Sequence, residues 1–221
     1  SGGTTPDRLR LPLTSLLVRK VVDGLTRGTS VTTIDGKMLQ AAILLAFHGF
    51  LRGSEFLADS SLSFNPLFEA TRDSVTFSSL SHQPVLQFRI KRSKTDPFAH
   101  GITIYIGQAR APYCPVRAMQ EYLSLSSHSS QQPLFCYASG TPLTCEKLTE
   151  KLRSLLLSAG ISNAKDYAGH SFRIGAATSA AACRIPDWQI RILGRWQSDS
   201  MLRYIRTHSA ELASVARTLA E

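Results

Sequence analysis

Four side chains in the last third of the chain have the chemistry to hold a phosphate group and to attack it. His170 and Arg173 stand three residues apart, and Ser171 between them can cap the start of a helix. A helix N-terminus offers unpaired N–H groups and partial positive charge, which favour phosphate. Trp196 adds an indole N–H, which only donates, and Tyr204 adds a phenol that could act as a nucleophile. Each is more often structural when it occurs alone, so their combination carries the argument.

Two further basic positions extend this set. Arg52 stands just before Gly53, at a predicted helix junction where a side chain can point into a site. Lys94 lies in a basic run with Lys91 and Arg92. Lys94 could donate to the same phosphate, and Lys91 and Arg92 compete with it for that position.

Hydrophobic periodicity predicts the elements that position these residues: a mostly helical chain with one small antiparallel sheet. Most of the helices come after the sheet, and prolines at first-turn positions mark two of their starts. The predicted helices span residues 13–25, 33–50, 115–125, 145–158, 171–184, 186–193, 200–206 and 210–219. Residues 124–132 read as a polar surface loop.

Alternating apolar residues predict three strands, at residues 74–78, 84–91 and 101–106. The last two form a hairpin whose connection carries Lys91, Arg92 and Lys94. A basic hairpin tip is well placed to reach a nucleic-acid backbone, so Lys91 and Arg92 are candidate DNA-backbone contacts. Arg195, outside the hairpin, is a third candidate.

The composition agrees with an anionic partner. The 221 residues carry a net charge of +9, and arginines outnumber lysines by 18 to 7. Arg binds phosphate with two parallel hydrogen bonds, which suits a phosphate-binding protein. A merely basic protein without such a partner is the alternative that charge alone leaves open.

The cysteines and the apolar runs limit the class of protein further. Cys114, Cys136, Cys145 and Cys183 form no C-x-x-C pair and no zinc-like spacing with a His, so we expect reduced thiols in an intracellular protein. We see no signal peptide and no apolar run long enough to span a membrane. Trp188 is expected in the hydrophobic core.

The order and spacing of these motifs resemble the tyrosine recombinase (integrase) family, over roughly residues 14–206. The motifs that carry the resemblance are Leu51-Arg52-Gly53-Ser54-Glu55, Ser93-Lys94-Thr95, Cys114-Pro115-Val116-Arg117-Ala118, His170-Ser171-Phe172-Arg173, Leu193-Gly194-Arg195-Trp196 and Tyr204-Ile205-Arg206. The last blocks are similar to recombinases of eukaryotic mobile elements of the Crypton, DIRS and Ngaro kinds, without a choice among the three.

The resemblance implies a role for each catalytic candidate. Arg52 and Arg173 would clamp the non-bridging oxygens of the scissile phosphate, and Trp196 would donate its N–H to it. Lys94 would protonate the departing 5′ oxygen, and His170 would assist near the tyrosine proton. Tyr204 would be the nucleophile and would form a 3′-phosphotyrosine without a metal, ATP or another cofactor.

The resemblance also implies the organisation and partners of the protein. Residues 1–13 would be a leading segment, beginning with a processing remnant at Ser1-Gly2-Gly3, and residues 14–221 a catalytic domain without the N-terminal core-binding domain of the family. Expected partners are double-stranded DNA and further copies of the full-length protein, as a tetramer on DNA. Nuclear residence is expected from the eukaryotic elements. Many family members have His where this chain has Trp196. The tryptophan keeps a hydrogen-bond donor but removes a possible proton carrier.

Three alternatives remain beside an active recombinase. The first is a domesticated, catalytically silent domain of the same fold that binds DNA or protein. The second is a type IB topoisomerase, which shares the chemistry but needs no specific site. The third is a basic helical module without catalysis, in which Tyr204 is structural.

Overall fold

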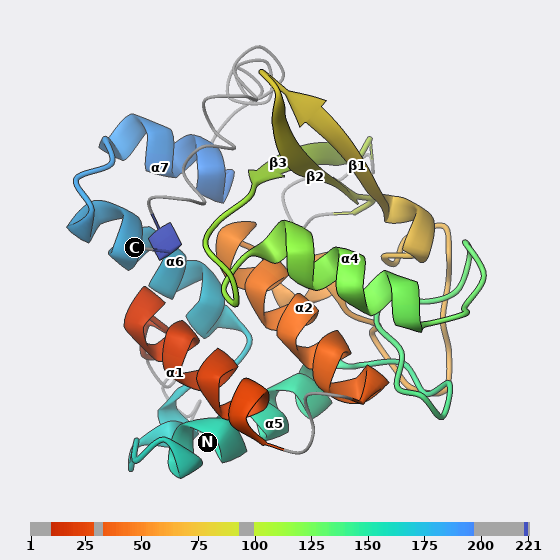
Figure 1. Ribbon diagram of the computed structural model, residues 1–221, viewed down its shortest axis with the longest axis horizontal. Helices are drawn as coiled ribbons and strands as arrows, with labels where there is room; N and C mark the ends of the chain where they lie inside the picture. Colours follow the sequence, from red (N-terminus) through yellow and green to blue (C-terminus); the bar gives the residue numbers. More distant parts are fainter. Residues whose placement is uncertain (1–9, 29–32, 93–99, 197–218, 221) are drawn as a thin grey trace, which may run out of the picture.

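The computed structural model describes residues 10–28, 33–92, 100–196 and 219–220. Helices surround one buried helix, and a small sheet packs at one side (Figure 1). The helices are α1 (Ser15–Arg27), α2 (Ile34–His48), α3 (Gly53–Phe56), α4 (Pro115–Leu125), α5 (Cys145–Ser158), α6 (His170–Ala182) and α7 (Asp187–Gly194). Two short 3-10 turns, η2 (Arg72–Ser74) and η3 (Ala164–Asp166), complete the helical part of the described chain.

Helix α2 is the centre of the core. All its residues from Met38 to His48 are buried, as expected of a helix that is apolar on nearly every side. Thr33 caps its start by accepting a hydrogen bond from the Gly36 N–H at 3.1 Å. Helices α1, α4 and α6 pack around it, so the chain that leaves its C-terminal end passes into the interior of the molecule.

The sheet is a three-stranded antiparallel meander in the order β1 (Val75–Leu80), β2 (Gln83–Ile90) and β3 (Ile102–Gly107). Val85, Leu86, Phe88 and Ile90 of the central strand are buried. Phe88 pairs with Ile104 of β3 and Val75 of β1. Helix α4 packs against β2 and β3, so the sheet is anchored to the helical core.

Helix α6 lies tightly against the segment that precedes α1. The Leu13 N–H donates to the Ser171 carbonyl at 2.9 Å, and the Ser15 N–H donates to Ser179 Oγ at 2.9 Å. Gly175 lies at this crossing, where an added Cβ would meet the Leu13 carbonyl oxygen at 1.8 Å. The close approach therefore requires glycine and fixes α6 relative to α1.

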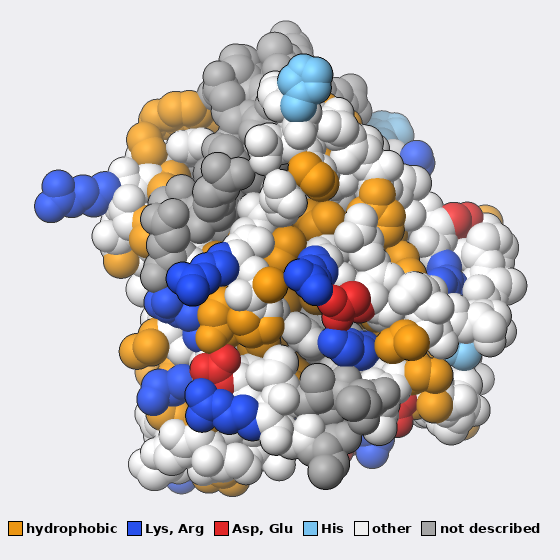
Figure 2. Space-filling model, viewed as in Figure 1, with side chains coloured by type: hydrophobic (Ala, Val, Ile, Leu, Met, Phe, Trp, Pro, Cys, Tyr) orange, Lys and Arg blue, Asp and Glu red, His pale blue; other side chains and the backbone are white. Residues whose placement is uncertain are grey.

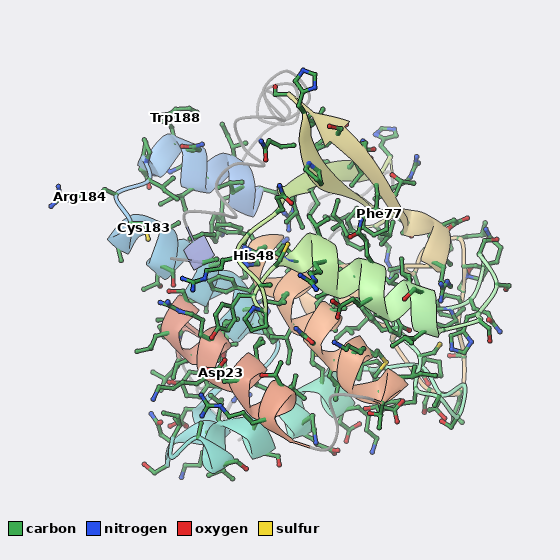
Figure 3. The ribbon with its side chains drawn as sticks, in the orientation of Figure 1. Asp23, His48, Phe77, Cys183, Arg184 and Trp188 are labelled. Carbon is green, nitrogen blue, oxygen red and sulfur yellow. The ribbon has the colours of Figure 1, made fainter. Side chains whose placement is uncertain are left out.

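The predicted fold class is confirmed, whereas the core position of Trp188 was wrong. The ring of Trp188 is 50% exposed, and Figure 3 shows it pointing away from the body of the molecule on α7. None of the four cysteines forms a disulfide. No helix in the described ranges is both long and apolar enough to cross a membrane. The predicted helices at residues 200–206 and 210–219 fall outside these ranges, except for residue 219.

Candidate active site

Arg52 lies where α2 ends and α3 begins. Phe50 adopts a left-handed conformation, with φ of 52°, which turns the chain toward this junction. Glu55, one turn further on, accepts a hydrogen bond from the Arg52 N–H at 2.9 Å, and its other oxygen lies 3.3 Å from Arg52 Nη1. The side chain of Arg52 is only 16% exposed and that of Glu55 is fully buried. The carboxylate thus fixes both the backbone and the guanidinium of Arg52.

His170 and Arg173 come from the first turn of α6, as predicted, but the cap differs. The helix begins at His170 itself, and Gly169 precedes it without a side-chain cap. Ser171 lies inside the helix, where its Oγ accepts a hydrogen bond from the Ala168 N–H at 2.9 Å. The hydroxyl therefore fastens the loop before α6, and the exposed His170 stands at the free end of the helix.

Arg173 is buried and incompletely bonded. Its Nη1 donates to the Phe50 carbonyl at 3.4 Å, and its Nη2 has no hydrogen-bond partner within the described residues. Burial, and secondarily the charges of Arg52 and Arg195, lower the pKa of Arg173 to about 9. A desolvated guanidinium beside two like charges is stabilised by an anion, so the arrangement favours a bound phosphate.

Trp196 contacts Arg173 through its ring face. The guanidinium carbon lies 4.3 Å from the ring centroid, a cation–π contact, and the residue is 40% exposed. Sequence reasoning had assigned Trp196 only an N–H donor role. The stack gives it a second role, which is to hold the guanidinium plane of Arg173 in one orientation.

Arg195 differs from its expected position at a DNA-facing surface. Its side chain is 5% exposed and forms an ion pair with Glu55, with Nη2 at 2.9 Å from Oε2. It also donates to the carbonyls of Gly49 and Phe50 at 2.9 Å each. All of its acceptors except the Leu193 carbonyl lie more than one hundred residues earlier in the chain, which is why no local pattern could reveal this contact.

Lys91 and Arg92 lie at the end of β2, where the predicted hairpin connection begins. Lys91 is turned toward the protein: its Nζ donates to the Pro66 carbonyl at 2.6 Å and to Thr71 Oγ1 at 2.7 Å. Desolvation by burial is the main cause that lowers the pKa of Lys91. Arg92 is more exposed and pairs with Asp59 at 3.2 Å. Lys94 and Tyr204 lie outside the described residues.

An open hollow joins several of these elements. It has a volume of about 720 Å³ and brings Arg52 and His170 together with residues at the start of α5. Its lining comprises Arg10, Arg52, Gly53, Ser54, Cys145, Thr149, Ala168, Gly169 and His170. Arg10 was not singled out from the sequence, because an isolated arginine before the first helix carries no pattern. Arg10, Arg52 and His170 thus place three basic side chains around one hollow, an arrangement whose charge would suit an anion.

Cys145 determines how closely the Arg52 and His170 loops approach each other. A Cβ added at Gly53 would lie 2.9 Å from its Sγ, and one added at Gly169 would lie 2.8 Å from it. Both glycines therefore let their segments approach the Cys145 thiol closely at the N-terminus of α5. This packing places the loop bearing Arg52 and the loop bearing His170 at the same edge of the hollow.

Comparison with solved structures identifies the fold. The chain is similar to Flpe in a Holliday junction complex, with a TM-score of 0.59 and 15% identity over 91% of this chain and 50% of that one. It is also similar to the site-specific recombinase XerH bound to its difH substrate, with a TM-score of 0.58 and 17% identity over 94% of this chain and 53% of that one. The chain thus spans about half the length of each.

No protein-family model and no curated protein matches the sequence. At these identities the solved structures establish the fold alone, which in this chain is a helical body with a three-stranded antiparallel sheet. The chain has the catalytic-domain fold of the tyrosine recombinases.

Proposed function

We propose that this chain is the catalytic domain of a site-specific DNA recombinase that cuts and rejoins DNA through a 3′-phosphotyrosine. The observation that carries the proposal is the state of Arg173, a buried guanidinium whose Nη2 has no hydrogen-bond partner among the described residues. It lies near Arg52, close enough for their like charges to interact. A fixed, desolvated donor pair of this kind stabilises charge that develops on phosphate oxygens in a transition state.

In the proposed reaction the Tyr204 oxygen attacks the scissile phosphorus, and the bond from phosphorus to the 5′ oxygen breaks. The phenolic proton leaves toward His170, and the departing 5′ oxygen takes a proton from a lysine, which we assign to Lys94. Arg52 and Arg173 would hold the non-bridging oxygens. A 5′ hydroxyl from another strand then reverses the steps, so the bond energy is retained in the phosphotyrosine link.

The finer assignments belong to this proposal. The DNA would be double-stranded, and the full-length protein would act as a tetramer on it, in the nucleus of a host carrying a mobile element. The amino-acid sequence of Gly194–Arg206 is similar to that of Crypton, DIRS and Ngaro recombinases, which supports an origin in a mobile element of one of these kinds. Residues 14–221 would form the catalytic domain, and the DNA-facing basic side chains would include Arg92 and Arg10.

Covalent trapping tests the proposal. Nicked suicide duplexes spanning candidate element ends are incubated with the chain, with Tyr204→Phe and with a matched tyrosine variant, Tyr137→Phe, in the half-buried 133–144 loop. We expect a slow band on a denaturing gel with the wild type and with Tyr137→Phe, and none with Tyr204→Phe. Covalent product that persists in Tyr204→Phe would remove Tyr204 as the nucleophile.

The same assay separates the alternatives. A catalytically silent domain would bind the duplex yet give no covalent band, even in a longer protein that includes an N-terminal DNA-binding domain. A topoisomerase would relax supercoiled plasmids that contain no element sequence, with repeated turnover. A recombinase is expected to give a covalent band only on duplexes carrying its site.

A further inference from the structure

Arg195 occupies a backbone conformation that arginine does not favour. It caps the C-terminus of α7 in the left-handed region, with φ of 57° and ψ of 41°. A side chain with a Cβ is less favourable than glycine in this conformation. The backbone conformation at this position therefore favours glycine. The presence of arginine indicates that its side chain has a role.

The side chain forms four hydrogen bonds, all to buried or backbone acceptors. Nη1 donates to the Gly49 carbonyl at 2.9 Å and the Leu193 carbonyl at 3.0 Å. Nη2 donates to the Phe50 carbonyl and to Glu55 Oε2, both at 2.9 Å. A planar fork with several donors satisfies this geometry, and a lysine ammonium does not.

Two of those acceptors are the same groups that hold the proposed phosphate-binding arginines. Glu55 accepts from both the backbone and the guanidinium of Arg52. The Phe50 carbonyl accepts from Arg173 Nη1 at 3.4 Å. Arg195 therefore shares the acceptor Glu55 with Arg52 and the Phe50 carbonyl with Arg173. It does not line the hollow where Arg52 lies.

Arg195 also connects these acceptors to α7. The next residue, Trp196, stacks on the Arg173 guanidinium at 4.3 Å. In the sequence, Tyr204 follows nine positions after Arg195. One residue thus links the Arg52 junction, the Arg173 guanidinium and the chain segment that leads to the proposed nucleophile.

We infer that Arg195 is a positioning residue, which orders Arg52 and Arg173 for phosphate binding by bonding to Glu55 and to the Phe50 carbonyl. This goes beyond its expected role as a DNA-backbone contact, since its guanidinium is enclosed and fully engaged apart from Nε. The expected effect of Arg195 on DNA cleavage rests on the proposed function. Its expected effect on the order of Arg52 and Arg173 does not.

The first test measures that order directly. Nε–Hε groups of Arg52 and Arg173 are followed by ¹⁵N relaxation in the whole chain, in wild type and in Arg195→Gly, which keeps the left-handed turn unstrained. We expect both groups to be rigid in the wild type and mobile in the variant. Two arginines as rigid in Arg195→Gly as in the wild type would overturn the inference, whether or not the protein cleaves DNA.

The second test measures single-turnover cleavage on the suicide duplex with saturating protein. Arg195→Gly should slow cleavage roughly 100-fold, the cost of misplacing a reacting group by about 1 Å. DNA affinity should stay within about threefold, because the residue touches no phosphate. Weaker binding together with a lower salt slope would instead identify Arg195 as a direct backbone contact and overturn the positioning role.

Further variants separate positioning from general loss of structure. Arg191→Ala removes an exposed arginine of the same helix, which pairs with Asp187 at 2.9 Å, and should leave cleavage unchanged. Glu55→Gln should slow cleavage as well, and adding Arg195→Gly to it should cost less than the sum of the two single effects, because both variants disturb the Arg195–Glu55 contact. If Arg195→Gly does not fold, Arg195→Lys and Glu55→Gln carry the test: full order of Arg52 in both would refute the inference.

Discussion

Arg173 shows how burial prepares a side chain for an anion. Its guanidinium is held by a carbonyl on one side and an indole face on the other, and one nitrogen is left without a partner among the described residues. Leaving a charged donor unpaired in the interior costs free energy. In the proposed function, a phosphate that completed the hydrogen bonds of Arg173 would recover that cost.

Replacing Arg173 therefore tests the phosphate clamp. Arg173→Ala should slow covalent cleavage by roughly 10³-fold or more, as loss of preorganised charge does. The matched control is Arg184→Ala, an exposed arginine two residues after the end of α6, where Figure 3 shows the side chain pointing away from the molecule. Single-turnover rates on the suicide duplex give the comparison. A rate within tenfold of the wild type for Arg173→Ala would contradict the assignment.

At the residue scale, the sequence predicted the types of side chain better than their surroundings. Arg52, His170 and Arg173 lie near one another, as the motif spacing suggested. The burial of Arg195 was not predictable, because its acceptors come from the distant α2–α3 junction. Trp188 was placed in the core because it is apolar, yet apolar residues are common on surfaces and exposure does not follow from type.

The crossing of α6 over the segment before α1 is a close contact between elements. Gly175→Ala should destabilise the protein by about 3 kcal/mol or more, because the new methyl group would overlap the Leu13 backbone. Urea denaturation followed by circular dichroism measures the change. Gly24→Ala is the matched control: its methyl group would meet Leu155 at an ordinary 3.6 Å, so helix propensity should stabilise the protein by roughly 0.5–1 kcal/mol. Equal effects of the two variants would argue against the close crossing.

His48, at the end of α2, should make the fold sensitive to acid. Burial lowers its pKa to about 4, and Figure 3 shows the side chain inside the molecule. The unfolded chain binds this proton from about pH 6.5, so stability is complete above that pH and is lost as pH falls toward 4. The loss between pH 8 and pH 5 is on the order of 2 kcal/mol.

The variant His48→Phe isolates this contribution. It keeps a ring beside Phe47, with which His48 makes an edge contact at 5.2 Å, and it removes the titration. Thermal melting at both pH values should show a smaller acid-induced drop in the variant than in the wild type. An equal drop in both proteins would assign the acid sensitivity to other groups.

Among the elements, boundaries were predicted best where a local signal sets them. Helices α4 and α5 begin where expected, since Pro115 occupies a first-turn position and Thr144 accepts from the Lys147 N–H. Helix α6 begins one residue earlier than expected, because the Ser171 hydroxyl bonds to the preceding loop instead of capping. The short α3 and the two 3-10 turns were not predicted, as three or four residues are too few to show a period.

The charge of the whole molecule points to a polyanion. The chain carries +9, and Figure 2 shows Lys and Arg side chains gathered around α1, with fewer acidic ones on that face. Binding to a DNA duplex should weaken with salt, with a slope of log affinity against log salt of about −4 or steeper, because phosphate contacts release counterions. Fluorescence anisotropy across a salt series measures the slope. An affinity that does not change with salt would exclude a backbone interface.

The fold as a whole was predictable because several signals agreed. One apolar helix, three alternating segments in a row and a run of capped helices leave few architectures, and the expected helical domain with a small antiparallel sheet is confirmed. The arrangement of the site was less predictable, since it depends on carbonyls and a carboxylate that only the packed chain brings together. Local rules give the elements, and long-range polar contacts give the site.

The stack of Trp196 on Arg173 has an optical consequence. An indole in contact with a guanidinium emits according to that cation's surroundings, and a phosphate arriving at Arg173 changes them. The chain has two tryptophans, so Trp188→Phe leaves a single emitter at the site. Its intensity should then report occupancy in real time, without any label on the DNA, and the rate of phosphate capture could be followed separately from the rate of strand cleavage.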